Sequence, residues 1–184
     1  MRFFLSKPGL ICACGSNPDE FFDSITKGDQ SGIKKITLGK TEDGEDRIFF
    51  VGKIDDSKLK KTGDKYEMRL LQIFQAALDE IATTVEKAVA KFGRERVGVC
   101  IGSCDNGSEL SLKAHKDFFE NGAFPNEYDL EIQGADYPAS FCAKKFGIKG
   151  LSLAFSTACS SSASAIAKAR ELLQAGMLDA GVCG

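Results

Sequence analysis

Apolar residues recur at intervals of three and four along one long stretch of the chain. This spacing predicts a single amphipathic helix over residues 65–92, because such positions share one helical face. The apolar positions are Leu70, Phe74, Ala77, Leu78, Ile81, Val85, Val89 and Phe92. Asp64 and Glu67 resemble a capping box at the start of this helix, and Gly93 ends it.

Continuous apolar runs with β-branched residues predict strands that helices cover on both faces. One such run lies at residues 97–101. We expect a second buried strand over residues 151–155 and a last strand from Ala180 onward. Helical stretches separate them, over residues 110–119, 135–146 and 159–174. Strands that alternate with helices in this way indicate an α/β fold, with layered α/β/α architecture around a mixed, mainly parallel sheet.

The first third of the chain predicts shorter elements. We expect a short buried strand over residues 2–5, a helix over 21–26 that Pro18 opens, and a hairpin whose turn is built around Gly44. No repeat or Pro-rich linker interrupts the sequence, so we expect one domain over residues 1–184. Because the last residues read as a strand just completed, we expect this domain to be truncated at its carboxyl end.

Charge and hydropathy exclude several partners. The chain has 24 basic and 26 acidic residues, a net charge of -2, so electrostatics give no reason to expect nucleic acid as a partner. No apolar run approaches the length of a membrane span, and Lys7, Pro8 and Gly9 break the amino-terminal run that a secretory signal would need. We therefore expect a cytoplasmic protein with no membrane attachment.

The cysteines fit neither a disulfide framework nor a metal site. They lie at positions 12, 14, 100, 104, 142, 159 and 183, an odd number spread over the chain. The close pairs at 12/14 and 100/104 lack the spacing of a zinc knuckle, and His115 is the only histidine. The turn at residues 102–107 lacks both the Walker spacing and the dinucleotide fingerprint, and we interpret it as an active-site wall. We expect reduced thiols, no metal and no cofactor.

Cys159 lies at the bend between a predicted strand and a predicted helix. A side chain at a helix amino terminus faces unpaired N–H groups and the positive end of the helix dipole, and both favour thiolate over thiol. Small neighbours leave room for a substrate carbonyl, and a backbone N–H at the bend can donate to an oxyanion. Cys159 is thus a candidate nucleophile, although a buried structural cysteine beside helix-capping serines fits the spacing equally well.

The sequence around Cys159 resembles the nucleophile region of the β-ketoacyl-[acyl carrier protein] synthases. The run TACSSS at 157–162 leads into an Ala-rich helix, and residues 175–184 continue the likeness. Residues 9–33 and 97–103 are similar to the family's opening segment and central strand, so the resemblance covers nearly the whole chain. Residues 6–9 replace the family's usual Thr-Gly-x-Gly, a departure that bears on the subfamily.

The resemblance implies the amino-terminal half of a thiolase-like fold and a condensing enzyme of fatty acid or polyketide synthesis. Such enzymes join a cysteine-bound acyl group to malonyl-acyl carrier protein by decarboxylative Claisen condensation. Cys159 would take the acyl chain from a phosphopantetheine-linked thioester, and its own N–H would form half of an oxyanion hole. The family's two histidines and second oxyanion donor match no position in residues 1–184, so we expect this chain alone to be inactive in condensation.

The resemblance also implies two protein partners. One is a second copy of the chain, paired antiparallel through strand 151–155 at the sheet edge to form a homodimer. The other is the acyl carrier protein, which is acidic. A basic cluster, formed by Lys58, Lys60, Lys61, Lys65 and Arg69, is either a docking edge for this carrier or a solvated helix entrance. We slightly favour the solvated entrance.

Alternative functions stay open. A thiolase or a chalcone-synthase-like enzyme shares the fold, and a non-catalytic scaffold could do so too. Cys159 argues against a scaffold, because inactive partners resembling this family usually lack the cysteine. A cysteine hydrolase would need His115 as its base, but this residue lies in a polar helix and matches neither family histidine, which favours a solvated surface histidine.

Overall fold

The sheet is built around one central strand. The computed structural model describes residues 2–105 and 107–184, and its main sheet has three parallel strands in the order β4-β3-β5. The strands are β3 (Val97–Gly102), β4 (Ser152–Phe155) and β5 (Ala180–Cys183). Val99 of β3 lies opposite Ser152 on one side and Val182 on the other. Both edges of β3 are therefore occupied within the chain.

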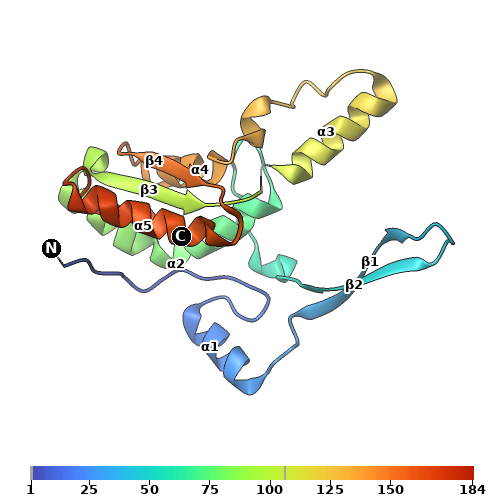
Figure 1. Ribbon diagram of the computed structural model, residues 1–184, viewed down its shortest axis with the longest axis horizontal. Coiled ribbons are helices and arrows are strands. Elements are labelled where there is room, and N and C mark those ends of the chain that lie inside the picture. Colours follow the sequence, from blue (N-terminus) through green and yellow to red (C-terminus); the bar gives the residue numbers. More distant parts are fainter. Residues whose placement is uncertain (1, 106) are drawn as a thin grey trace.

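Side chains of β3 alternate between two helical layers. Val97, Val99 and Ile101 belong to a core cluster with residues of α2 (Arg69–Phe92) and α4 (Tyr137–Phe146). Cys100 points into a second cluster with α5 (Ser161–Gln174), which covers the opposite face of the sheet (Figure 1). The expected α/β/α layering is confirmed, and β3 is buried as expected. The expectation of a buried strand over residues 151–155 is wrong, because β4 lies at an edge of the sheet and has no buried residue. The alternation follows from the two-residue period of a strand, which gives each helical layer every second side chain.

The start of α2 differs from the capping box expected at residues 64–67. The helix begins at Arg69, and its N-cap Met68 makes no side-chain cap. The Arg69 N–H instead donates to Glu109 Oε2 at 2.8 Å, from the first turn of α3 (Ser108–Asn121). Glu67 accepts the backbone N–H groups of Thr62 and Gly63, so it organises the loop before the helix. The predicted capping box is wrong because the side chain that accepts the Arg69 N–H lies 40 residues away in the sequence.

Asp64 ties this loop to α4. Its carboxylate accepts hydrogen bonds from the Tyr66 N–H at 3.1 Å, from Lys144 Nζ at 3.0 Å and from the Tyr137 hydroxyl. The side chain is only 6% exposed. Burial raises the pKa of this carboxyl group, but the three donors outweigh burial and hold the pKa below its ordinary value. The loop is therefore fixed by a buried, ionised carboxylate.

The strand expected at residues 2–5 is wrong. These residues form no strand, and Phe4 and Leu5 are exposed. Apolar composition predicts burial, but a strand also needs a neighbour that accepts and donates its ladder hydrogen bonds, and residues 2–5 pair with none. Farther along, the segment lies against α2, where a Cβ on Gly9 would stand 2.0 Å from the Ala77 carbonyl oxygen.

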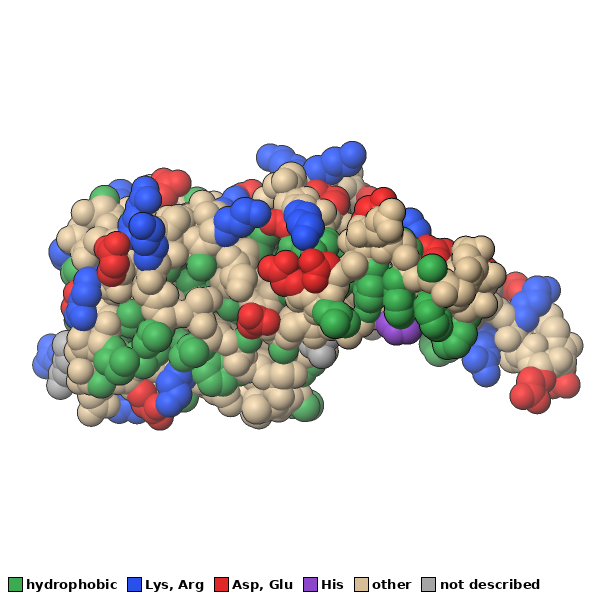
Figure 2. All heavy atoms as spheres, turned by 90° about the horizontal axis from the view of Figure 1, so that it is seen from above, with side chains coloured by type: hydrophobic (Ala, Val, Ile, Leu, Met, Phe, Trp, Pro, Cys, Tyr) green, Lys and Arg blue, Asp and Glu red, His purple; other side chains and the backbone are tan. Residues whose placement is uncertain are grey.

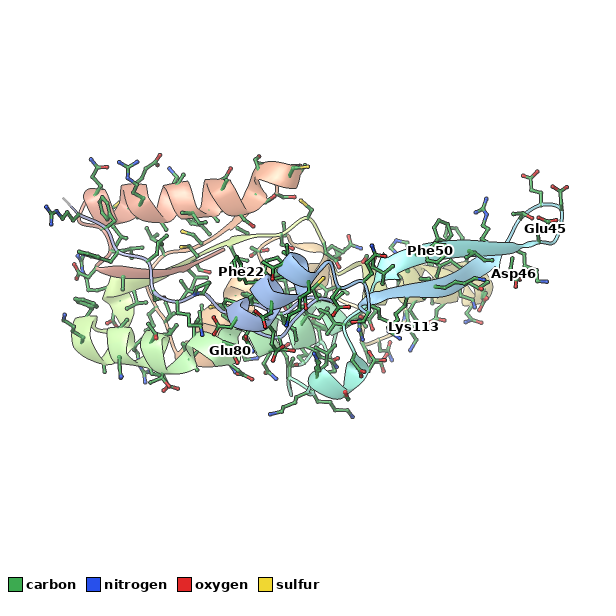
Figure 3. All side chains as sticks on the ribbon, turned by 90° about the horizontal axis from the view of Figure 1, so that it is seen from below. Phe22, Glu45, Asp46, Phe50, Glu80 and Lys113 are labelled. Carbon is green, nitrogen blue, oxygen red and sulfur yellow. The ribbon has the colours of Figure 1, made fainter. Side chains whose placement is uncertain are left out.

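The helix and hairpin that follow are confirmed. Asn17 caps α1 (Pro18–Lys27) by accepting the Glu20 N–H at 2.9 Å. Strands β1 (Ile33–Lys40) and β2 (Asp46–Gly52) pair antiparallel. The hairpin extends away from the three-stranded sheet, with Glu45 and Asp46 near its tip (Figures 1 and 3). No helix in the described part of the chain is long and apolar enough to cross a membrane.

The Asp64 network predicts a pH-dependent stability. We expect Asp64→Asn to lower the free energy of unfolding by about 1–3 kcal/mol at pH 7, since an amide cannot replace a carboxylate that accepts three donors. A carboxyl group whose pKa is lower in the folded than in the unfolded state stabilises the fold at pH values above its unfolded-state pKa of about 3.9. This stabilisation is lost as the pH falls through the folded-state pKa. Urea denaturation at a series of pH values from about 2 to about 7 measures the difference in free energy of unfolding between the variant and the wild type.

Asp43→Asn, on the exposed hairpin turn, is the matched control. It should change the stability by less than about 0.5 kcal/mol at any of these pH values. Equal losses from the two substitutions, or an Asp64→Asn loss that does not shrink in acid, would contradict the network.

Candidate functional site

Cys159 lies on an exposed turn between β4 and α5. One turn of 3₁₀ helix (Ala158–Ser160) joins the strand to the helix, and the Cys159 side chain is exposed. The Ser103 N–H donates to the Phe155 carbonyl at 2.9 Å and anchors the end of β4 beside the end of β3. The strand-turn-helix expected around Cys159 is therefore present, and the alternative of a buried structural cysteine is excluded.

Gly102 lets the amino terminus of α5 lie directly on the end of β3. A Cβ at this position would stand 2.5 Å from the carbonyl carbon of Ser161 and from the nitrogen of Ser162. Only glycine leaves room for this approach of backbone to backbone. The contact fixes the position of the first turn of α5 relative to the end of β3. It thereby also fixes the position of the turn that carries Cys159.

The residue before Cys159 has an unusual backbone conformation. Ala158 has φ +52°, and no other residue with a side chain has positive φ among those described. A residue with a Cβ in the left-handed region costs about 1–2 kcal/mol relative to the ordinary helical region. Neighbouring hydrogen bonds accompany this conformation: Thr157 N–H donates to Ser161 Oγ at 3.0 Å, and the Ser161 hydroxyl donates to the Ala158 carbonyl at 2.8 Å.

The electrostatics of the turn suit a negative charge. The N-cap of α5, Ser160, makes no side-chain cap hydrogen bond, and its hydroxyl donates to the Thr157 carbonyl instead. No capping side chain therefore neutralises the first-turn N–H groups of a 14-residue helix, whose dipole places partial positive charge next to Cys159. The arrangement can stabilise an oxyanion formed at a carbonyl bound beside it.

The structure adds a second thiol to the site, Cys104, which the sequence analysis did not single out. Its Sγ lies 3.4 Å from Ser161 Oγ and 3.7 Å from the Ala158 carbonyl oxygen. The hydrogen bond with Ser161 is the main cause of a lowered pKa of the Cys104 thiol. The expected role of the loop after β3 as a wall of the site is consistent with this contact; Asn106 of that loop lies outside the described residues.

His115 lies in an aromatic cluster. Its Nδ1 is 2.7 Å from the Ser111 carbonyl oxygen, and its ring packs edge-on against Phe124 and Tyr128. Figure 2 shows the histidine bordered by hydrophobic side chains. His115 is thus a half-buried surface residue and not a fully solvated one, because aromatic residues after α3 pack against its ring. None of its recorded contacts in the described chain reaches Cys159 or Cys104, so the two cysteines do not form a Cys–His pair with it.

Neighbouring side chains partly neutralise the basic cluster before α2. Lys65 pairs with Asp129 at 3.4 Å, Arg69 pairs with Asp56, and Lys58 donates to Ser16. Lys60 and Lys61 are exposed. Elsewhere in the described residues, no three His, Cys, Asp or Glu side chains gather as a metal site.

An apolar hollow opens beside the carboxyl end of β3. Its volume is about 340 Å³. Side chains and backbone of the amino-terminal segment, of α2 and of β3 form its walls, among them Leu10, Ile11, Leu70, Phe74, Ile101 and Ser103. Ser103 directly precedes Cys104, so the hollow begins one residue from the second thiol of the site.

The exposure of the thiols predicts their order of alkylation. We expect iodoacetamide at neutral pH to label Cys159 well before Cys142 and Cys100, as resolved by peptide mass spectrometry. Burial raises the pKa of the Cys142 thiol to about 12 and also raises that of Cys100, so both should react only when the fold opens. Labelling of Cys159 at the slow rate of Cys142 in a folded sample would contradict the exposed turn.

Two solved structures are similar to this chain. A ketosynthase from Xenorhabdus doucetiae, solved in complex with its chain length factor, superposes with a TM-score of 0.83 at 26% identity. The match covers 98% of this chain and 46% of that one. The ketosynthase from module 6 of the bacillaene synthase of Bacillus subtilis 168 shares the fold, with a TM-score of 0.57 at 20% identity over 94% of this chain and 29% of that one. The expected thiolase-like α/β fold is thereby confirmed.

Curated relatives and a family match agree with the structures. The 3-oxoacyl-[acyl-carrier-protein] synthase 2 of Staphylococcus aureus strain MRSA252 is 25% identical over 189 residues, and that of strain N315 is 26% identical over 188. Each alignment covers 100% of this chain and 45% of the relative, so the chain spans just under half their length. The family described as β-ketoacyl synthase, N-terminal domain, matches residues 9–184. The chain belongs to the β-ketoacyl synthase family, of which it carries the N-terminal domain.

Proposed function

We propose that this chain is the nucleophile-bearing half of a condensing enzyme of fatty acid or polyketide synthesis, with Cys159 as its nucleophile. One observation carries the proposal: in a chain of this family, Cys159 is exposed on the turn that ends at the first residue of α5. The uncapped helix start beside it can stabilise the oxyanion that forms when the sulfur attacks a thioester carbonyl.

The first chemical step is acyl transfer to sulfur. The Cys159 thiolate attacks the carbonyl carbon of an acyl thioester, and the carbonyl oxygen becomes an oxyanion that a backbone N–H at the turn can stabilise. Collapse of this intermediate breaks the bond to the carrier thiol, which leaves as a thiolate and takes up a proton. The acyl group then remains on Cys159 as a new thioester, while the turn keeps it at the surface of the domain.

The second step is the condensation. Malonyl thioester loses carbon dioxide, its C2 attacks the acyl carbonyl on Cys159, and the sulfur leaves as thiolate with a β-ketoacyl product released on the carrier. By the family resemblance, two histidines and a second oxyanion donor support this step, and they match no position in residues 1–184. Condensation therefore requires groups beyond this chain, while acyl transfer needs only the turn.

We propose acyl carrier protein as the partner that delivers both groups through its phosphopantetheine arm. The curated relatives are named for this carrier. The apolar hollow beside the site has the chemistry that an acyl chain requires. A hydrolase is less well supported, because His115 is held in its own aromatic cluster, and a scaffold role would leave the exposed cysteine unexplained.

Substitution of Cys159 tests the chemistry directly. In the complete polypeptide of the reading frame, Cys159→Ala should abolish covalent acylation by acyl-acyl carrier protein, measured as intact mass, and with it β-ketoacyl formation. Cys14→Ala, at a half-buried thiol of the amino-terminal segment, should retain both. Residues 1–184 alone should form no β-ketoacyl product. Acylation that survives in Cys159→Ala, or condensation by residues 1–184, would refute the proposal.

We further propose that two copies of the chain associate through β4. The strand order places β4 at an edge of the sheet, and no strand among residues 2–105 and 107–184 pairs with its outer side. An open edge of this kind associates readily, and Leu151 beside it is a large exposed apolar residue. Antiparallel pairing of β4 with its own copy about a twofold axis would join the two sheets and form a homodimer.

A charge on β4 should weaken this dimer. Ser152→Asp adds an exposed carboxylate to the edge strand, and twofold pairing places one such charge from each copy in the interface, so the dimer should dissociate about tenfold or more readily. Ser57→Asp adds the same charge at an exposed position far from the sheet and is the control. Sedimentation equilibrium measures both. A strictly monomeric wild-type protein, or equal effects of the two substitutions, would contradict pairing through β4.

A further inference from the structure

Three consecutive serines follow Cys159, and they have different surroundings. Ser161 is buried, with 5% exposure. Ser160 and Ser162 are exposed. The hydroxyl of Ser160 bonds to Thr157, whereas Ser162 has no recorded side-chain hydrogen bond in the described chain. Membership of the serine run therefore does not explain why, of these three residues, only Ser161 is buried.

Ser161 bridges the two sides of the left-handed residue. Its oxygen accepts the Thr157 N–H, one residue before Ala158, and its proton goes to the Ala158 carbonyl, one bond before Cys159. These two bonds, at 3.0 and 2.8 Å, connect the peptide group before Thr157 with the peptide group after Ala158, so they span the dihedral angles of both residues. The bridge thus opposes relaxation of φ +52° toward the ordinary region that an alanine prefers.

Cys104 completes the hydrogen bonding of Ser161. A serine hydroxyl has one proton and two lone pairs. The proton is directed to Ala158, and one lone pair accepts the Thr157 N–H. Cys104 Sγ lies 3.4 Å from the same oxygen, within hydrogen-bonding distance for sulfur. A residue from the loop after β3 thereby holds the Ser161 oxygen in place.

We propose that Ser161 is a positioning residue for the nucleophile: its hydroxyl, supported by Cys104, keeps Ala158 in the left-handed conformation and so directs Cys159 outward at the start of α5. The contact of Gly102 with the backbone of Ser161 gives this bridge a rigid base. The inference depends on the proposed function only in taking Cys159 as the group that needs a fixed direction.

Alkylation of Cys159 measures the position of this thiol without any acyl substrate. In Ser161→Ala, the turn should relax away from the helix amino terminus, and the second-order rate of iodoacetamide labelling at Cys159 should fall about tenfold at pH 7. Ser162→Ala changes the same atoms on the next residue and should stay within about twofold of wild type. Labelling of buried Cys142 in the same samples reports opening of the fold and should remain equally slow in all three proteins.

Ala158→Gly separates positioning from a general loss of packing. Glycine adopts φ +52° without support, so Ser161→Ala should slow Cys159 much less in the Ala158→Gly background than in wild type. The same tenfold fall in both backgrounds would overturn the proposal, as would an unchanged Cys159 rate in Ser161→Ala. A rate that falls as proposed, in an enzyme whose Cys159→Ala variant still condenses, would uphold Ser161 while removing the proposed function.

Discussion

The close contact between Gly102 and the first turn of α5 is the constraint on which the site depends. Because no side chain separates them, the end of the central strand and the start of the helix meet backbone to backbone. The position of Ser161 follows from this contact, and the hydroxyl of Ser161 in turn bonds to the peptide group before Thr157 and to the peptide group after Ala158. An exposed Cys159 at a helix amino terminus is the result of that sequence of contacts.

The central strand gives this constraint its rigidity. β3 is hydrogen-bonded on both edges and buried on both faces, so its carboxyl end cannot shift without disturbing two helical layers. Closely packed protein interiors transmit such constraints over several residues. A parallel sheet also brings the carboxyl ends of its strands to one edge, and here the loop after β3 and the turn after β4 meet there, which places Cys104 beside Ser161.

Polar groups outside the site follow the same logic on a smaller scale. Asp64 gathers donors from its own loop and from α4, and Glu109 supplies the cap that α2 lacks in its own sequence. His115 is held by Ser111 and by aromatic rings that follow α3. Asp64 and Glu109 each accept a hydrogen bond from another segment, whereas His115 bonds within its own helix.

The sequence by itself determined the elements whose signal is local. The three-and-four spacing of α2, the apolar run of β3 and the small residues around Cys159 each report solvent exposure, which repeats along a strand or helix with a fixed period. The bend at Cys159 was predictable for the same reason, since it is where one period gives way to the other. The TACSSS run at residues 157–162 also indicated the family, because a family resemblance is judged residue by residue along the sequence.

Tertiary structure alone decided which groups meet. Residues 2–5 have the composition of a strand but no pairing partner, and the N–H of Arg69 finds its acceptor 40 positions away. Cys104 and Ser161 are 57 positions apart, and no spacing rule connects them. Local pattern fixes which face of an element avoids water, whereas the contact between two faces depends on how all the elements pack together. For that reason the candidate nucleophile could be predicted from sequence, and the residues that hold it could not.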